Sequence, residues 1–166
     1  MQLKPFKKAV FLDRDGIVNH DPGDYTKSVD EFEILPNVLD TLAKWDAAGY
    51  GLIVITNQAG IDKKLYEYEH VDAMHQYLQG ECIKRGFEIA AFYYCPHHPD
   101  FSGKCLCRKP GSLMVEKGLH RFGLDPKNCV LIGDKERDIE AGEKAGVRGV
   151  LQKTNDNIYE SMIEIR

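Results

Sequence analysis

The clearest indication of architecture is AVFLDRDG, residues 9–16, in which four apolar residues run directly into two carboxylates and a glycine. A short apolar run bounded by a turn signal is typical of a buried parallel strand. Open α/β sheets bind their ligands outside the carboxyl ends of such strands. Asp13 and Asp15 are therefore expected where chemistry is done, although two solvated acids in a surface turn would give the same pattern.

Further apolar runs alternate with segments of helical periodicity along the rest of the chain. The expected strands, after the run at residues 9–12, are residues 52–55, 87–94, 129–132 and 147–151. The expected helices are residues 36–49, 67–85, 112–122, 136–145 and 155–165, with loops at residues 17–35 and 95–110. Strands that alternate with helices predict βαβ units, and therefore an α/β fold with a parallel sheet.

Length and composition favour one soluble domain that spans residues 1–166. Hydrophobic residues make up 43% of the chain, which is enough for a core. The 22 basic and 26 acidic residues give a formal charge of −4, which argues against a nucleic acid or a membrane surface as partner. Residues 1–8 show no secretory signal, and no apolar run approaches the roughly 20 residues of a membrane span. We expect a cytoplasmic monomer without a large inserted cap domain.

Polar residues follow three of the expected strands at the point where each strand ends. They are Asp13 and Asp15 after the first strand, Thr56 and Asn57 after the second, and Asp134 after the fourth. The carboxyl ends of parallel strands meet at the same edge of a sheet. These side chains are therefore expected to converge on one site.

Such a site suits the hydrolysis of a phosphate ester. The Asp13 carboxylate can attack phosphorus to form an aspartyl-phosphate, which water then hydrolyses. A carboxylate and a phosphate charge about 4 Å apart repel by roughly 4 kcal/mol at an effective dielectric constant near 20, so the site must supply cations. Mg²⁺ accepts carboxylate ligands, here from Asp13 and Asp134, and Lys109 can add a fixed positive charge. Thr56 and the N–H groups after it can hold phosphate oxygens, and Asp15 can act as general acid and base.

Four ordered motifs resemble those of the haloacid dehalogenase superfamily of phosphatases. The motifs are Asp13-Arg14-Asp15-Gly16, the strand that ends at Thr56-Asn57, Arg108-Lys109-Pro110, and Gly133-Asp134 with Asp138. The resemblance covers residues 10–151 and implies a Rossmann-like, mostly parallel sheet with helices on both faces.

The same resemblance implies a Mg²⁺-dependent mechanism with Asp13 as the nucleophile and Asp15 as the acid and base. Asp134 would bind the metal together with Asp13 and the backbone carbonyl of Asp15, while Thr56 and Lys109 would contact the phosphoryl group. The motif residue Asp138 would be a supporting acid or a charge on a helix surface.

Three of the five cysteines lie within residues 95–107, a pattern that suggests a metal rather than disulfides. Three thiolates and one imidazole suit a closed tetrahedral Zn²⁺ site, which would order a loop poor in apolar residues. The candidate ligands are Cys95, Cys105, Cys107, and either His97 or His98. Reduced thiols without metal are the alternative. The other two cysteines, Cys82 and Cys129, lie in apolar elements and are expected in the core.

The cysteine loop is similar to that of a narrower subgroup, the heptose bisphosphate and histidinol-phosphate phosphatases. This resemblance implies the zinc ligands Cys95, His97, Cys105 and Cys107. It also implies substrate contacts from Asn57, Gln58, Arg108 and Lys135. The chain departs from the subgroup at Ile17, where threonine or valine is common, and at Ala59, where serine is common.

We expect the substrate to be a sugar phosphate, and the reaction to be removal of the 7-phosphate from a heptose 1,7-bisphosphate. One alternative is a histidinol-phosphate phosphatase, whose amine substrate could use Asp21 or Asp24 as its acidic partner. The other is a catalytically inactive, zinc-stabilised binding module.

Overall fold

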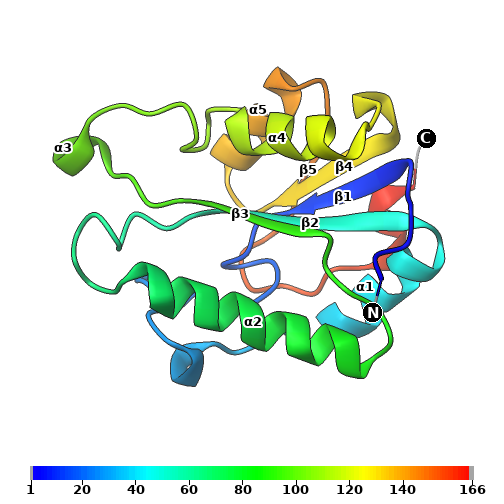
Figure 1. Ribbon diagram of the computed structural model, residues 1–166, viewed down its shortest axis with the longest axis horizontal. Coiled ribbons are helices and arrows are strands. Elements are labelled where there is room, and N and C mark those ends of the chain that lie inside the picture. Colours follow the sequence, from blue (N-terminus) through cyan, green and yellow to red (C-terminus); the bar gives the residue numbers. More distant parts are fainter. Residues whose placement is uncertain (1, 165–166) are drawn as a thin grey trace.

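The structure, a computed structural model, describes residues 2–164, which form a sheet of five parallel strands (Figure 1). The spatial order of the strands is β3-β2-β1-β4-β5. The strands are β1 (Lys8–Leu12), β2 (Tyr50–Asn57), β3 (Ala91–Cys95), β4 (Cys129–Gly133) and β5 (Arg148–Leu151). Because β1 pairs with both β2 and β4, the first strand of the chain lies at the centre of the sheet.

Helices cover both faces of the sheet (Figure 1). The first pair, α1 (Val38–Ala47) and α2 (Tyr68–Lys84), lies on one face, and α4 (Leu113–Phe122) and α5 (Glu136–Lys144) lie on the other. The short helix α3 (Pro99–Ser102) lies at the tip of a loop that extends beyond β3. Between residues 2 and 164, 3₁₀ turns are formed by Val29–Glu31, Pro126–Asn128 and Glu160–Ile163. The predicted fold class, a Rossmann-like parallel sheet with helices on both faces, is confirmed.

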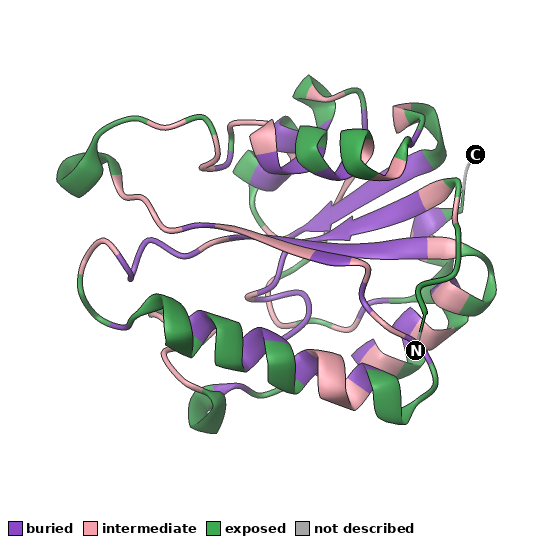
Figure 2. Cartoon of the chain, in the orientation of Figure 1, coloured by how far each residue is buried: buried purple, intermediate pink, exposed green. Residues whose placement is uncertain are grey.

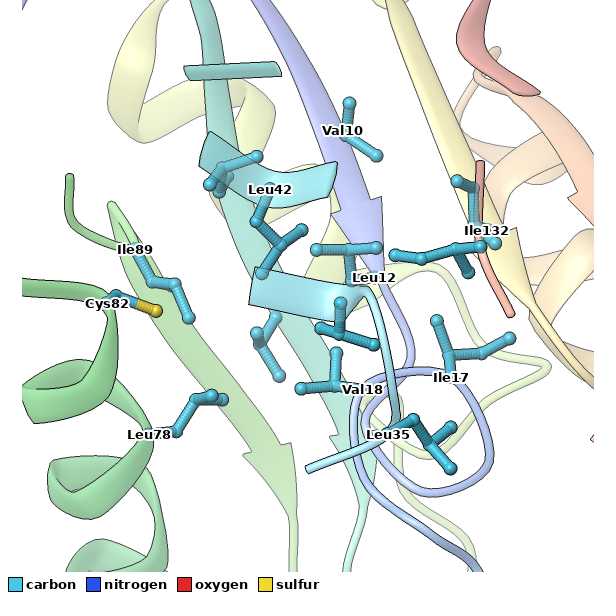
Figure 3. Packing of buried hydrophobic residues seen from close by; sticks show 14 of the residues in the cluster. Val10, Leu12, Ile17, Val18, Leu35, Leu42, Leu78, Cys82, Ile89 and Ile132 are labelled. Carbon is cyan, nitrogen blue, oxygen red and sulfur yellow. The ribbon is translucent and has the colours of Figure 1, made fainter. Parts of the chain in front are cut away.

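The central strand is apolar on both faces because each face is covered by helices. Val10 and Leu12 belong to the core cluster that includes Leu42 of α1, and Phe11 belongs to the cluster on the α4 side. Figure 2 shows the strands as a buried layer between helices whose outer faces are exposed. Figure 3 shows Leu12 close to Leu42 and to Ile17, which fills the same core. Each such side chain, fully buried, stabilises the fold by roughly 1.5–3 kcal/mol.

The two cysteines expected in the core are there. Cys82 of α2 belongs to the cluster beneath α1 and α2, and Cys129 at the start of β4 belongs to the cluster beneath α4. Both thiols are buried, as their position within apolar elements predicts.

The C-terminal segment is not the helix expected at residues 155–165. Asn155 has a left-handed φ of 64°, and the helical turn that follows within the described residues is the short Glu160–Ile163. The segment is held against α1 because the Trp45 indole N–H donates to the Glu160 carbonyl at 3.1 Å. These tertiary contacts override the local helical pattern; position 165 lies outside the described residues.

The third strand starts later than expected at residues 87–94. Ile89 exchanges two hydrogen bonds with the Gln79 side chain, whose Oε1 accepts from the Ile89 N–H at 2.8 Å and whose Nε2 donates to the Ile89 carbonyl at 2.9 Å. The Gln79 side chain thus forms the hydrogen bonds to the Ile89 N–H and carbonyl groups that a neighbouring strand would otherwise form. As a result, β3 begins only at Ala91. The two expected loops, residues 17–35 and 95–110, contain a 3₁₀ turn and α3, respectively.

Each strand is followed by a loop, so loops surround the carboxyl edge of the sheet. Over residues 2–164, no second domain is inserted between the strands. None of the helices in the same range has the length and apolar character needed to cross a bilayer.

Two glycines within helices provide a test of this packing. A Cβ at Gly118 of α4 would lie 2.7 Å from Phe11 Cε1, whereas a Cβ at Gly80 of α2 would meet no atom within 4 Å. We expect Gly118→Ala to lower the free energy of unfolding by about 1 kcal/mol, because an overpacking cost of about 1–3 kcal/mol exceeds a helix-propensity gain of about 1 kcal/mol. Urea unfolding of the purified variant measures the change.

The matched control is Gly80→Ala, which gains the same helix propensity without a clash. It should raise the free energy of unfolding by about 0.5–1 kcal/mol. Equal stabilisation by both substitutions would contradict the close approach of α4 to β1.

Candidate active site

The expected polar residues converge at the carboxyl edge of the sheet. Strands β2, β1 and β4 are neighbours, and the Asp13 N–H donates to the Ile132 carbonyl of β4 at 3.0 Å. The side chains of Asp13, Asp134 and Asp138 are exposed by only 11%, 1% and 1%, and that of Lys109 by 2%. These four side chains form a buried group, here called the carboxylate–lysine cluster.

Lys109 lies at the centre of this cluster. Its Nζ is 2.7 Å from Asp13 Oδ1 and 2.7 Å from Asp138 Oδ1, and it donates to the Ile55 carbonyl at 3.3 Å. Its backbone is held by Asn57, whose Oδ1 accepts from the Lys109 N–H at 3.0 Å and whose Nδ2 donates to the Lys109 carbonyl at 3.2 Å. Both polar atoms of Asn57 are therefore used to place the lysine.

The carboxylate–lysine cluster carries more negative than positive charge. Carboxylate oxygens of Asp13, Asp134 and Asp138 lie within 4.8 Å of one another, with one ammonium group between two of them. Burial raises the pKa of Asp13 well above its usual value; Lys109 lowers this pKa, and Asp138 and Asp134 raise it. Burial lowers the pKa of Lys109, but Asp13 and Asp138 outweigh burial and raise it, so the lysine stays charged.

The donor set of the cluster fits a magnesium ion. Hard divalent cations prefer oxygen ligands, and carboxylates supply them here. A buried set of three carboxylates around one ammonium is also costly unless a further cation offsets the charge. The chemistry and the electrostatics therefore both favour a cation beside Asp13 and Asp134.

Asp138 is fully buried and is not a charge on a helix surface. Its Oδ2 accepts from the N–H groups of Asp134 and Lys135 at 3.1 and 3.0 Å, and its Oδ1 faces Lys109. Asp138 thus links the turn that carries Asp134 to the ammonium group at the centre of the site.

Asp134 is also held by Thr154, a residue that no sequence pattern indicated. Thr154 Oγ1 donates to Asp134 Oδ2 at 2.7 Å. Gly16 packs against the same carboxylate, since a Cβ at this position would lie 2.4 Å from Asp134 Oδ2, and its φ of +90° is left-handed. Only glycine suits both the conformation and the space at this position.

Asp15 lies in a different environment, surrounded by hydrogen-bond donors. Its Oδ1 accepts from Arg14 NH2 and Asn19 Nδ2, and its Oδ2 accepts from Gln58 Nε2, each at 2.9 Å. Burial raises the pKa of Asp15, but the Arg14 charge and these hydrogen bonds outweigh burial and lower it. The pKa values of Asp13 and Asp15 are thus shifted in opposite directions, because Asp13 is buried beside other carboxylates and Asp15 is surrounded by hydrogen-bond donors.

Gln58 connects Asp15 to the end of β2. Its Nε2 also donates to Thr56 Oγ1 at 2.8 Å, and its Oε1 accepts from the Tyr66 hydroxyl at 2.6 Å. The residue is 2% exposed. The amide of Gln58, expected to contact substrate, is therefore bound to other side chains of the protein.

Arg14 and His75 form a buried pair that the sequence analysis did not connect. Arg14 has no exposed surface, and its NH1 lies 3.3 Å from His75 Nε2. The His75 ring stacks on Phe92 with a centroid separation of 4.6 Å. In the sequence, an arginine between two motif aspartates resembles a solvated surface charge. The one feature that could have indicated its burial is its position directly after a buried strand.

The two expected basic contacts lie at the rim of the site. Arg108 is half-buried, and its NH1 donates to the His97 carbonyl at 3.3 Å. The Lys135 side chain is 45% exposed, with its Nζ 3.6 Å from Asp134 Oδ2. Lys135 is therefore close to the cluster without being buried in it, whereas the Arg108 side chain is bound to the cysteine loop.

A second group of possible metal ligands lies in the loop after β3. Cys95 Sγ is 3.0 Å from Cys107 Sγ and 3.6 Å from Cys105 Sγ, and His97 Nδ1 is 3.4 Å from Cys95 Sγ and 3.3 Å from Cys107 Sγ. His98 points elsewhere, because its Nδ1 accepts from the Asp100 N–H at the start of α3. Three sulfurs and one imidazole nitrogen at these spacings fit a tetrahedral zinc ion, and of the two histidines the geometry favours His97.

Comparison with known proteins identifies relatives over most of the chain. Residues 106–161 match the family model described as HAD-hydrolase-like. The chain is 37% identical over 153 residues to the D-glycero-α-D-manno-heptose-1,7-bisphosphate 7-phosphatase of Photorhabdus laumondii subsp. laumondii, an alignment that covers 89% of this chain and 83% of that protein. It is 35% identical over 159 residues to the D-glycero-β-D-manno-heptose-1,7-bisphosphate 7-phosphatase of Pasteurella multocida, with coverage of 93% and 86%.

A solved structure supports the same relationship. The D,D-heptose 1,7-bisphosphate phosphatase from B. bronchiseptica, complexed with magnesium and phosphate, superposes with a TM-score of 0.81 and is 33% identical. The match covers 87% of this chain and 79% of that one.

The buried pair of Arg14 and His75 generates a prediction about pH and stability. Burial, with the nearby Arg14 charge, lowers the pKa of His75 to about 3. An unfolded histidine titrates near a pKa of about 6.5, so between these values the unfolded chain binds more protons and stability falls as the pH falls. We expect His75→Gln to remove about 2 kcal/mol of the stability loss between pH 7 and pH 5, measured by urea unfolding.

The control is His120→Gln, at an exposed position of α4. This variant should show the same pH dependence as the wild type. If His75→Gln also keeps the wild-type pH dependence, His75 is protonated in the folded protein and a neutral His75 beside Arg14 is wrong.

Proposed function

Because the chain belongs to the haloacid dehalogenase-like hydrolases, the family of the heptose bisphosphate phosphatases, we propose that it removes the 7-phosphate of D-glycero-D-manno-heptose 1,7-bisphosphate. The observation that carries the proposal is the buried carboxylate–lysine cluster at the carboxyl edge of the sheet. The identity of the substrate rests on the curated relatives. Their names specify the α anomer in one case and the β anomer in another, so the proposal covers the heptose and not its anomeric form.

Asp13 is the proposed nucleophile. One of its carboxylate oxygens attacks phosphorus, the bond between phosphorus and the ester oxygen breaks, and the phosphoryl group is carried as an aspartyl-phosphate. Lys109, whose Nζ lies 2.7 Å from Asp13 Oδ1, offsets the negative charge that approaches with the substrate. The Thr56 hydroxyl and the N–H groups that follow β2 are the proposed donors to the phosphoryl oxygens.

Asp15 is the proposed general acid and base. It gives a proton to the departing sugar oxygen, and then takes a proton from the water that attacks the aspartyl-phosphate and restores Asp13. Its donors Arg14, Asn19 and Gln58 fix the carboxylate in place. Its lowered pKa suits the base step, and a phosphate dianion bound beside it would raise this pKa for the acid step.

Asp13, Asp134 and the backbone carbonyl of Asp15 are the proposed ligands of a magnesium ion. When bound, the ion neutralises charge on the phosphoryl oxygens and on the carboxylates around it. Thr154 and Asp138 keep Asp134 and its turn in position for this role. The related structure from B. bronchiseptica is described as complexed with magnesium and phosphate.

Cys95, His97, Cys105 and Cys107 are the proposed ligands of a structural zinc ion. Four protein ligands leave no open position, so this metal would order the loop and take no part in the reaction. The loop leads directly into Arg108 and Lys109, and the Arg108 N–H donates to Cys105 Sγ at 3.4 Å. The proposed role of the zinc is therefore to fix the segment that carries Lys109 into the site.

The rim cations Arg108 and Lys135 are the proposed contacts for the part of the substrate that does not react. A bisphosphate keeps a second phosphate after the reaction, which requires positive charge outside the carboxylate–lysine cluster.

The cytoplasm is the proposed compartment, because it keeps thiols such as these five free cysteines reduced. The proposed form of the protein is a monomer.

Phosphate release from purified heptose 1,7-bisphosphate and from histidinol phosphate, with and without Mg²⁺, tests the proposed function. The wild type should prefer the heptose bisphosphate and require Mg²⁺. Asp13→Asn should lose about 10³-fold or more in kcat, because an amide cannot form the aspartyl-phosphate. Its circular dichroism spectrum should be unchanged, since the substitution conserves volume.

The control is Asp30→Asn, at an exposed position in the Val29–Glu31 turn, which should keep full activity. Phosphate release by Asp13→Asn at the wild-type rate would remove Asp13 as nucleophile. A preference for histidinol phosphate, or no release from either compound, would overturn the proposed substrate.

The zinc site is tested by the neighbouring histidines. His97→Ala should lower the zinc content of the purified protein from one equivalent to near zero and reduce its melting temperature, since a ligand is lost. His98→Ala should keep the zinc, because His98 Nδ1 accepts from the Asp100 N–H and does not face the thiols. Metal analysis of both variants gives the answer; zinc lost from His98→Ala and kept by His97→Ala would reverse the assignment.

A further inference from the structure

Asn155 joins a loop near the active site to the segment that follows β5. The Asp21 N–H donates to Asn155 Oδ1 at 2.6 Å, and Asn155 Nδ2 donates to the Asp21 carbonyl at 2.8 Å. The Asn155 N–H also donates to the Gly16 carbonyl at 2.9 Å. The paired bonds between Asn155 and Asp21, here called the Asn155 clamp, connect positions 134 residues apart in sequence.

The Asn155 clamp lies between the two sets of carboxylates that the mechanism uses. On one side, Asn19 donates to Asp15 Oδ1, and the chain continues directly into residues 20–24. On the other side, Thr154 donates to Asp134 Oδ2, and Asn155 is the next residue. The start of this loop, His20 and Asp21, therefore lies between Asp15 and the turn after β5.

Little else holds this part of the loop. Within the described residues, segment 21–27 makes no long-range hydrogen bond other than the two to Asn155; its remaining bonds join Gly23 to Asp21 and Lys27 to Glu31. Residues 22–24 are exposed. At the far end, Tyr25 packs on Tyr66 with a ring separation of 6.1 Å. Without the clamp, residues 21–24 would be fixed only where the loop begins, at Asn19 and His20, and at this far end.

Asparagine suits this position for two reasons. Its φ of 64° is left-handed, a conformation that asparagine tolerates better than most residues. Its amide also offers a donor and an acceptor at once, which match the N–H and C=O of a single residue, Asp21. Glycine would adopt this backbone conformation more easily, but it has no side-chain amide to bind Asp21.

We propose that Asn155 is a positioning residue for substrate recognition, because it holds residues 20–24 where they contact the part of a sugar phosphate beyond the reacting phosphoryl group. The proposal rests on the proposed phosphatase function. Asn155 touches neither Asp13 nor Asp15, so its loss changes the binding of substrates large enough to reach the loop. The groups that carry out the chemical step lie in the carboxylate–lysine cluster, so the rate of that step should not depend on Asn155.

The test uses Asn155→Gly, which keeps the left-handed conformation and removes the amide. Steady-state kinetics are measured with the sugar phosphate that the wild type hydrolyses fastest and with acetyl phosphate, which is too small to reach the loop. Loss of two hydrogen bonds should raise KM for the sugar phosphate about tenfold, with kcat changed less than about twofold. KM for acetyl phosphate should not change.

The matched control is Asn37→Gly, since Asn37 has the same φ of 64° and its side chain makes no capping hydrogen bond. Its KM for both substrates should equal that of the wild type. Asn155→Asp keeps an acceptor for the Asp21 N–H but cannot donate to the Asp21 carbonyl, so its KM should lie between those of the wild type and Asn155→Gly.

An unchanged KM in Asn155→Gly, an equal rise for both substrates, or the same rise in Asn37→Gly would each overturn the positioning role while the wild type remains an active phosphatase. A wild type that releases phosphate from no sugar phosphate would overturn the proposed function, and this inference with it. The two failures are therefore distinguishable by the activity of the wild type.

Discussion

The site depends on one buried contact, the Lys109 ammonium group between the carboxylates of Asp13 and Asp138. Both Nζ–oxygen distances are 2.7 Å, and all three side chains are almost completely buried. Buried charges are costly to desolvate, and removing one partner leaves the others uncompensated. The rest of the structure keeps the lysine in this contact: Asn57 binds both polar groups of its backbone, and the cysteine loop leads the chain to that position.

The two motif aspartates differ because the structure supplies them with different partners. Burial raises the pKa of Asp13, and the one ammonium group beside it is shared with another carboxylate. Asp15 has a guanidinium group and two amide donors, and its pKa is lowered. Both residues follow the end of β1, where no regular strand sets their directions, so each side chain is placed by its own partners. Two carboxylates two positions apart therefore lie in different electrostatic environments.

The sequence was sufficient for those features that depend on short patterns. The buried strand at residues 9–12 and the polar residues at three strand ends follow from apolar runs and their boundaries, and the structure confirms both. Arg14, Thr154 and Asn155 could not be predicted, because their roles come from contacts with residues that are distant in sequence. The prediction of a helix at residues 155–165 was wrong for the same reason, because Asn155 and the Glu160 carbonyl form hydrogen bonds with other parts of the chain. His97 and His98 became distinguishable only when their side-chain directions were known.

The site is bordered by loops from three separate parts of the chain, and each is fixed by bonds from a side chain to backbone groups. Asn57 holds the lysine segment, Asp138 holds the turn after β4, and Asn155 holds the loop after β1. Ordering a loop residue costs about 1–2 kcal/mol in backbone entropy, so loops without a core of their own need such bonds to keep one conformation. A side-chain amide or carboxylate can satisfy both the N–H and C=O groups, or two successive N–H groups, of a turn that lacks a strand partner. With no second domain over the sheet edge in residues 2–164, these few bonds set the positions of the loops around the site.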